Sequence, residues 1–294
     1  AASSGLLAID RASYFNQNVP MNPDARELAR FMARAGHVAV ITGAGVSTAS
    51  GIPDYRDRNG DWKHARPVQY ADFVARPEVR QRYWARSFAG WARIANAKPN
   101  RAHTALAALE SAGTVNTLIT QNVDGLHHRA GSRQVIDLHG RLQRVRCMGC
   151  GKTACREQWQ EQLAAANPDW RVGTDYFAPD GDAKLQEEDV SAFIAPDCAS
   201  CGGFIKPDVV FFGENVPRDR VASAFEALDG ADALLVVGSS LMVYSGYRFA
   251  RRAAETGKPI AIVNRGRTRA DDIAAVRIDA DCGEVLDSVS RNGG

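Results

Sequence analysis

The chain has 294 residues, an apolar fraction of 45% and a formal net charge of +2 at neutral pH. A chain of this length can bury a sizeable core in one large domain or in two. The near-neutral charge argues against a nucleic-acid-binding protein, because such proteins carry a strongly positive surface. Since no apolar run reaches the roughly 18 residues of a transmembrane helix, we expect no membrane partner.

The first predicted elements are an arm, a helix and a buried strand. Residues 1–23 are expected to form a loose N-terminal arm. The first twenty of them lack the charged start and long apolar region of a secretory signal. Asn22-Pro23-Asp24 predicts a helix start, and this helix is expected to run through Ala35 with Gly36 as its stop. The apolar, β-branched run from Val38 to Ile41 then predicts a buried parallel strand.

The strand is followed at once by the glycine turn Thr42-Gly43-Ala44-Gly45. Glycines let the backbone approach a ligand closely, and a helix starting between Val46 and Ala49 would aim its free N–H groups at a phosphate. Gly43-x-Gly45 is only part of a dinucleotide-binding fingerprint, so an ordinary tight strand-to-helix turn is the alternative. The following loop sets an acid, an aromatic and an arginine beside this turn: Asp54, Tyr55 and Arg56.

The next 39 residues predict a loop and a cap. Residues 57–66 are polar and predict a mobile loop beside the ligand, whereas residues 67–95 are rich in aromatics and arginines and predict a helical cap. Tyr83 and Arg86 are three residues apart, so a helix would place both on one face. The simplest interpretation of the segment alone is a helix that packs its aromatic side chains and exposes its arginines.

Short apolar strands that end in small, polar or ionisable residues recur along the rest of the chain. After a helix over residues 101–111, strands are expected at 115–119, 135–138, 208–212, 233–237 and 260–263. Helical stretches between most of them predict a doubly wound α/β fold with a parallel, Rossmann-like sheet. Ligands bind at the carboxyl ends of the strands in such sheets, so one crevice should collect Gly43, Gln121, Asn122, Asp124, His139, Ser239 and Asn264.

Two Cys-x-x-Cys pairs predict a structural zinc site. They are Cys147 with Cys150, and Cys198 with Cys201. Four thiolates surround tetrahedral Zn²⁺ and leave no position for water, and matched pairs favour a metal over disulfides and therefore a reducing compartment. The 47 residues between the pairs exceed the usual spacing, which we attribute to an insertion carrying Trp159, Trp170 and the acidic run 187–189. Cys155 and Cys282 lie outside the pattern, and Cys282 is expected near the crevice.

Several motifs together resemble those of the sirtuins, which are NAD-dependent protein lysine deacylases. They are GAGVSTASGIPDYR at 43–56, TQNVDGLH at 120–127, HG at 139–140, the two cysteine pairs, KPDVVFFGE at 206–214 and VVGSSLMVYS at 236–245. The resemblance covers about residues 30–285. It is greatest to class II sirtuins, and among them to the mitochondrial sirtuin-four type, through RPVQYADFV at 66–74, RQRYWARSFAGW at 80–91, APDGD at 178–182 and VYSGYRF at 243–249.

The resemblance implies a division of the chain into parts. A Rossmann-like NAD-binding domain would comprise residues 24–56, 96–145 and 208–290. A helical cap with the cofactor loop would comprise residues 57–95, and a smaller zinc-ribbon domain residues 146–207, with the N-terminal arm over 1–23. The smaller zinc-ribbon and helical domain would thus be inserted into the larger one.

The resemblance also implies roles for individual residues. NAD binding is expected of Gly43, Ala44, Gly45, Ser47, Asp54, Tyr55, Arg56, Gln121, Asn122, Val123, Asp124, His139, Gly238, Ser239, Ser240, Asn264, Arg265, Gly266 and Cys282. An acyl-lysine peptide is expected to add as a strand along Val210, Phe211, Phe212, Gly213, Met242, Val243 and Tyr244. In class II the pattern that falls on Tyr83 and Arg86 reads acidic acyl groups such as succinyl or malonyl.

The chemistry implied by the resemblance needs a base. A buried acyl-lysine carbonyl oxygen attacks the nicotinamide-bearing ribose carbon, which gives an alkylimidate and releases nicotinamide. A ribose hydroxyl must then be activated, and His139 suits this task because the unperturbed pKa of histidine lies near the operating pH. Asn122 and Asp124 would assist catalysis, and the products would be the free lysine and O-acyl-ADP-ribose. For an isolated histidine, hydrogen bonding at a strand end is the alternative role.

The motifs leave rival functions open. Besides a deacylase that favours acidic or bulky acyl groups, the same site would serve a protein mono-ADP-ribosyltransferase or a lipoamidase. A non-enzymatic NAD-binding scaffold, a zinc-ribbon nucleic-acid module and a hydride-transfer dehydrogenase are further alternatives, disfavoured by the intact Asn122, Asp124 and His139, the near-neutral charge and the incomplete fingerprint. We expect a monomer in the bacterial cytoplasm, with the mitochondrial matrix as the alternative location.

Overall fold

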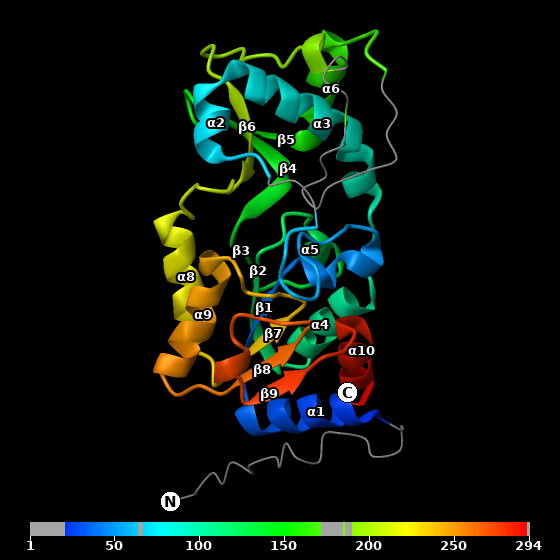
Figure 1. Cartoon of the computed structure of the whole chain (residues 1–294), viewed down its shortest axis with the longest axis vertical. Helices are drawn as coiled ribbons and strands as arrows, with labels where there is room; N and C mark the ends of the chain where they lie inside the picture. The colour runs from blue at the N-terminus through cyan, green and yellow to red at the C-terminus, as the bar shows by residue number, and fades with distance from the viewer. Residues whose placement is uncertain (1–20, 64–66, 172–184, 186–189, 293–294) are drawn as a thin grey trace, which may run out of the picture.

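The computed structural model of the chain describes residues 21–63, 67–171, 185 and 190–292, and it forms two lobes (Figure 1). The expected N-terminal arm therefore lies almost wholly outside the described residues, as do the APDGD motif and the acidic run 187–189. In Figure 1 the lower lobe holds the parallel sheet, and the upper lobe holds a small sheet with its own helices. No helix in the described part of the chain is long and apolar enough to cross a membrane.

The large lobe is built on a six-stranded sheet in which every neighbouring pair is parallel. Its strand order is β3-β2-β1-β7-β8-β9. The strands are β1 (Val38–Thr42), β2 (Val115–Thr120), β3 (Val135–Asp137), β7 (Ala233–Val237), β8 (Ile260–Val263) and β9 (Val276–Ile278). This order confirms the predicted doubly wound sheet, and its direction of winding reverses between β1 and β7, where ligands bind in such folds.

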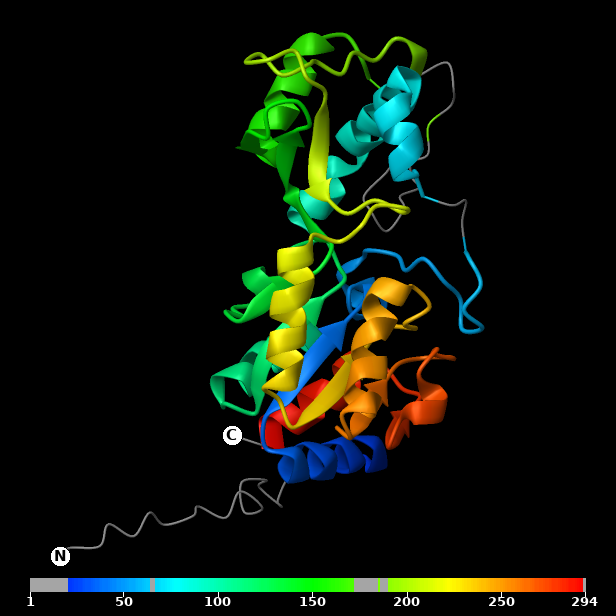
Figure 2. The same cartoon turned by 90° about the vertical axis from the view of Figure 1, so that its left-hand side faces the viewer.

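Helices cover both faces of this sheet (Figure 2). One face packs against α1 (Pro23–Ala35), α4 (Arg101–Ser111) and α10 (Cys282–Asn292), and the other against α8 (Arg218–Asp229) and α9 (Tyr244–Glu255). The side chains of β1 alternate between the two cores: Val38 and Val40 enter the first, and Ala39 and Ile41 the second. Burial on both faces explains why the strand is apolar from Val38 to Ile41.

The small lobe combines an antiparallel sheet with helices from two parts of the chain. Its strands, in the order β5-β4-β6, are β4 (Gly140–Cys147), β5 (Thr153–Cys155) and β6 (Ile205–Val209). They pack with α2 (Tyr70–Ala75), α3 (Pro77–Asn96) and α6 (Arg156–Ala166) around a separate aromatic core. The helical structure predicted for residues 67–95 is confirmed as α2 and α3. Trp84 on α3 and Trp159 on α6 pack together with ring centroids 5.3 Å apart.

Two sequence predictions about secondary structure are wrong. The strand expected at 208–212 spans Ile205–Val209 instead, and it pairs antiparallel with β4 in the small sheet because β7 occupies the position beside β1 in the main sheet. No α-helix starts between Val46 and Ala49. The chain forms two short 3₁₀ turns there, η2 (Ala44–Val46) and η3 (Thr48–Ser50), which end at Gly51 in the left-handed conformation with φ of 82°.

Two short elements complete the large lobe. The helix α5 (Leu126–Arg129) follows β2, and the 3₁₀ turn η4 (Asp271–Ile273) precedes β9. The strand β9 was not predicted, because Arg277 interrupts its short apolar sequence.

Candidate active site and metal centre

A cavity of about 770 Å³ lies at the carboxyl ends of β1, β2 and β7 and is closed above by residues of the small lobe. It is lined by every residue for which NAD binding was expected except Gly266, and by all seven residues expected to hold the peptide. Tyr83 and Arg86 do not line it. Residues from five of the quoted motifs therefore meet in one crevice, as the positions of the strand ends predicted.

The glycine turn after β1 is packed directly on the turn after β7. The N–H of Gly45 donates to the carbonyl oxygen of Gly238 at 2.8 Å, and a Cβ atom built on Gly45 would lie 2.8 Å from the same oxygen. Any side chain there would push the two turns apart. Gly45 thus allows the backbone turns after β1 and β7 to pack against each other, and main-chain atoms of both turns line the cavity.

A network of amides and a buried acid forms the polar wall. Ser47 donates its hydroxyl to Asp124 Oδ2 at 2.7 Å, and the N–H of Leu126 donates to Oδ1 at 2.8 Å. Asn122 donates from Nδ2 to the carbonyl oxygen of Gly43 at 3.0 Å and to Ser47 Oγ at 3.1 Å. Burial raises the pKa of the Asp124 carboxyl, and the two hydrogen bonds oppose that rise.

His139 lies two residues after the end of β3, and its two ring nitrogens have different partners. Nδ1 lies 2.9 Å from the carbonyl oxygen of Gln121, and Nε2 lies 2.8 Å from Ser245 Oγ. A carbonyl oxygen can only accept, so Nδ1 carries the proton and Nε2 accepts a hydrogen bond from the Ser245 hydroxyl. Burial lowers the pKa of His139 to about 4, with smaller contributions from the positive charges of Arg220 and Arg248.

The imidazole is therefore neutral at physiological pH and has its lone pair on Nε2, inside the cavity. Ser245, on the first turn of α9, is a residue that the sequence analysis did not single out. Ser245 is the last residue of the motif quoted at 236–245, but nothing in that motif indicates a hydrogen bond to His139, which lies 106 residues earlier in the chain. A neutral base with a directed lone pair is what proton abstraction requires.

Positive side chains surround the entrance to the cavity. Arg56 stacks on Trp62 with its Cζ atom 4.1 Å from the ring centroid and donates to the carbonyl oxygen of Gly60 at 2.7 Å, which fixes the loop after the glycine turn. Further cations line the cavity: Arg58, Lys63, Arg265 and Arg267. The cavity is lined by six cationic and five acidic side chains, and its size fits a dinucleotide.

Cys282 lines the same cavity but is not a nucleophile. Its side chain is buried, and burial raises the pKa of the thiol to about 11. The group is thus a neutral thiol at physiological pH. Its location agrees with the prediction that it lies near the crevice.

Tyr83 and Arg86 lie on α3, in the small lobe. Tyr83 is 2% exposed and packs edge-to-face on Phe73 with ring centroids 5.5 Å apart. It lines a second, smaller pocket of about 40 Å³ with residues that also line the main cavity, among them Tyr55, Val123 and Phe211. Arg86 is half-buried and lines neither pocket, and its Nε atom is buried without a hydrogen-bond partner among the described residues.

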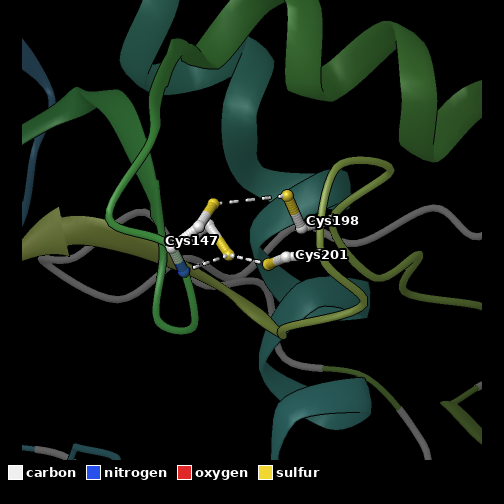
Figure 3. A group of neighbouring side chains, drawn as sticks. Cys147, Cys198 and Cys201 are labelled. Carbon is white, nitrogen blue, oxygen red and sulfur yellow. Dashed lines mark hydrogen bonds between the residues drawn. The ribbon is translucent and has the colours of Figure 1, made fainter.

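The four predicted metal ligands converge in the small lobe (Figure 3). Their sulfur atoms all lie within 4.8 Å of one another, with Cys147 Sγ and Cys201 Sγ 3.4 Å apart and Cys150 Sγ and Cys198 Sγ 3.9 Å apart. Tetrahedral Zn²⁺ with Zn–S bonds of about 2.3 Å requires sulfur–sulfur separations of about 3.8 Å. Cys155 is exposed and stands apart from this group.

The backbone around the cysteines also fits a thiolate cluster. The N–H groups of Gly149 and Cys150 point to Cys147 Sγ at 3.4 and 3.5 Å, and the N–H of Gly203 points to Cys201 Sγ at 3.4 Å. Such hydrogen bonds stabilise negative charge on sulfur. Four thiolates without a water position define a structural zinc centre, as the sequence predicted.

Comparisons with known proteins agree with this geometry. Residues 43–245 match the model of the Sir2 family. The chain is 54% identical to an NAD-dependent protein deacetylase of Bordetella bronchiseptica, over 90% of this chain and 97% of that protein. It is 48% identical to the mitochondrial NAD-dependent protein lipoamidase sirtuin-4 of Bos taurus, over 91% of this chain and 86% of that protein. A solved structure of Sir2 with a p53 peptide and NAD⁺ superposes with a TM-score of 0.74 at 32% identity, covering 92% of this chain and 98% of that one.

Proposed function

The chain belongs to the Sir2 family, and from this membership we infer that it is an NAD-dependent protein deacetylase in the broad sense, acting on acyl-lysine side chains. The single observation that carries the proposal is His139, a neutral base whose unprotonated Nε2, hydrogen-bonded to Ser245, lies at a dinucleotide-sized cavity. The experiment that tests it is nicotinamide release from NAD in the presence and absence of an acyl-lysine peptide. Release only with peptide is the expected result.

The residues of the cavity divide the work of this reaction. Bound NAD supplies a ribose carbon from which nicotinamide leaves, and its ADP-ribose part receives the acyl group, so that O-acyl-ADP-ribose is the expected second product. Asp124 and Asn122, held by Ser47, fix the polar wall at the cofactor. Nε2 of His139 would accept the proton of a ribose hydroxyl of NAD, which would take the place of the Ser245 hydroxyl beside Nε2. The Nδ1–H of His139 would stay hydrogen-bonded to the carbonyl oxygen of Gln121.

We propose that the two segments at the rim hold the substrate chain. Val210–Gly213 and Met242–Tyr244 both line the cavity, and they come from the small lobe and the large lobe respectively. An extended peptide between them would add its main chain to theirs and direct the acyl-lysine inward. The likeness of this fold to Sir2 structures with bound acetylated peptide supports this proposal.

The acyl preference is a finer proposal that rests on Tyr83 and Arg86. The small pocket beside Tyr83 shares five lining residues with the main cavity, so it is the natural extension of the acyl-lysine site: Tyr55, Val123, Val210, Phe211 and Phe212. Arg86, one helical turn beyond Tyr83, has a buried Nε atom that lacks a partner among the described residues. Arg86 lines neither pocket, so its guanidinium must turn toward Tyr83 to meet a carboxylate at the end of the acyl chain. On this basis we propose a class II preference for acidic acyl groups.

A panel of acyl-lysine peptides tests this preference. Succinyl and glutaryl peptides should be turned over faster than acetyl and lipoyl peptides, and Arg86→Ala should lower kcat/KM for the acidic groups by about tenfold or more, which is the value of one charged hydrogen bond. The acetyl peptide serves as the internal control for the variant. Fast turnover of the lipoyl peptide that is unchanged in Arg86→Ala would contradict this preference. It would favour the lipoamidase alternative, the activity that the name of the sirtuin-4 relative gives.

Ser245→Ala should shift the acidic side of the pH–rate profile upward. The hydroxyl donates to Nε2, and only the neutral imidazole can accept that hydrogen bond, so its loss should raise the pKa of His139. Because the base must be neutral, kcat/KM of the variant should begin to fall at a higher pH than that of the wild type. The groups of nearby charge, Arg220 on α8 and Arg248 on α9, are unchanged in the variant. Ser245→Thr keeps the hydroxyl and should keep the wild-type profile; identical profiles for all three proteins would show that Ser245 does not act on the base.

A further inference from the structure

A cluster of arginines and tyrosines lies at the rim of the cavity, around the start of α9. We call it the arginine–tyrosine patch, and it consists of Tyr244, Tyr247, Arg248, Arg251 and Arg269. The Cζ atoms of its three arginines lie 5.6, 5.6 and 5.9 Å from the centroid of the Tyr244 ring. Arg269 also stacks on Tyr247 at 4.2 Å. Tyr244 is 46% exposed, so the patch faces solvent.

The positive charges of the patch are poorly compensated. Within the described residues, only Arg251 has a carboxylate partner, Glu255 on the same helix at 3.2 Å, and both of these side chains are more than half exposed. Arg248 has a buried Nε atom without a hydrogen-bond partner in the described part of the chain. Arg269 donates from its side chain only to the carbonyl oxygen of Met242, at 3.5 Å. Three guanidinium groups around one ring repel one another, and a bound anion would relieve that repulsion.

Arg269, with its Cζ atom 4.2 Å from the centroid of the Tyr247 ring, is held over an aromatic ring before any ligand binds. A guanidinium that lies over an aromatic ring uses its flat face, so its N–H groups remain available along its edge. Those edges match carboxylates in bidentate fashion. Stacking also restricts the long side chains before a ligand arrives, which lowers the entropy lost on binding. The patch therefore has the charge and the order of a carboxylate-binding surface.

The position of the patch connects it to the substrate. Met242, Val243, Tyr244 and Arg248 line the main cavity, so the patch begins where the proposed peptide segment ends. Val243 is 38% exposed beside it. A protein chain that inserts an acyl-lysine into the cavity along Met242–Tyr244 would carry its neighbouring residues over the three arginines.

We propose that the arginine–tyrosine patch binds aspartate or glutamate side chains of the substrate protein, in the residues that flank the acylated lysine. This inference rests on the proposed deacylase function and names the substrate class of the same site: acyl-lysines in acidic sequence surroundings. The acyl group and the flanking sequence are then read by different residues, the first in the small lobe and the second on α9.

Three peptides that share one acyl-lysine and differ only in their flanking residues test the proposal. One has glutamate, one glutamine and one lysine at the flanking positions. Wild-type kcat/KM should be about tenfold higher for the glutamate peptide than for the glutamine peptide, as expected of two or three partly exposed charge pairs, and lowest for the lysine peptide. The difference should appear mainly in KM, and it should shrink between 50 and 500 mM salt, because exposed charges are screened.

The variant for this test is Arg251→Ala combined with Arg269→Ala, since neither residue lines the cavity. Its glutamate-to-glutamine ratio of kcat/KM should fall to within about twofold of one, by loss of two of the three charges. Arg30→Ala, an exposed arginine on α1 at the far end of the large lobe, is the matched control and should keep the wild-type ratio.

Equal kcat/KM of the wild type on the glutamate and glutamine peptides would overturn the proposal, while turnover of both would leave the deacylase function intact. A preference that survives in the double variant would also overturn it. If none of the peptides is turned over, fluorescence anisotropy of labelled, unacylated glutamate and glutamine peptides decides the matter directly. Tighter binding of the glutamate peptide, lost in the double variant, supports the patch, and equal binding refutes it.

Discussion

Replacing His139 by alanine should lower deacylation by about 10²- to 10⁴-fold, the usual contribution of a general base. The imidazole is the neutral base of the cavity, with Nδ1–H bonded to Gln121 and Nε2 free to take a proton once Ser245 is displaced. Alanine leaves no group within reach of that proton. The measurement is the single-turnover rate of peptide deacylation followed by mass spectrometry, so that slow product release does not hide the effect.

The control is His37→Ala. His37 precedes β1 at the amino end of the sheet, and its contact with Asp232 is 3.8 Å long between side chains that are more than half exposed. This variant should retain wild-type turnover. Both variants should unfold at the wild-type temperature and keep their zinc, since neither residue belongs to the metal centre. Near-normal deacylation by His139→Ala would refute its role as the base.

The second large effect is expected at the metal centre. Replacing Cys147 and Cys198 together by serine should abolish zinc binding and unfold the small lobe. Cys147 ends β4, and Cys198 belongs to the loop that leads into β6, so the metal ties together two segments between which the chain makes a long excursion. Zinc binding in small domains is worth on the order of 10 kcal/mol, which exceeds what the neighbouring apolar contacts can replace.

Metal content by atomic absorption and unfolding by calorimetry are the two measurements. The wild type should hold one zinc ion per chain, and the double variant none, with a fall in Tm of more than about 10 °C, which corresponds to a few kcal/mol. Cys155→Ser is the matched control, because Cys155 is exposed and outside the cluster. An unchanged Tm in the double variant would show that the four thiols do not hold a structural metal.

The sequence predicted most of the main sheet because most of its strands are recognisable from their local apolar pattern alone. β7 and β8 are apolar throughout, and β1 is apolar up to its last residue, Thr42; each run is followed by a small or polar residue, a pattern typical of buried parallel strands. The segment beginning at Asp208 shows the same pattern, yet its strand belongs to the other sheet. Strand pairing depends on β4, which lies more than 60 residues earlier, and no local pattern records that partner.

The sequence also predicted most, but not all, of the residues that line the candidate site. Residues at the ends of β1, β2 and β3 were expected in one crevice, and the structure brings them together. The glycine turn was expected to open an α-helix, but Gly51 and Pro53 follow too soon for one to form. Ser245 and the arginine–tyrosine patch could not be predicted, since each depends on side chains that only the folded chain brings together. The acyl-reading role of Tyr83 and Arg86 and the domain boundaries remain predictions.

The peptide bond between His139 and Gly140 joins the two lobes, and this has a mechanical consequence. His139 follows the parallel sheet, Gly140 opens β4 of the small lobe, and the carbonyl of His139 accepts from the N–H of Val210, just after β6. Gly140 has a φ of 83°, and a Cβ atom there would lie 2.0 Å from the carbonyl oxygen of Asp208. His139, the proposed base, is therefore part of the connection between the two lobes. A tilt of the zinc-binding lobe would turn the imidazole of His139 with it. Loss of the metal would therefore be expected to displace the base through the backbone, although the four cysteines of the metal centre do not line the cavity.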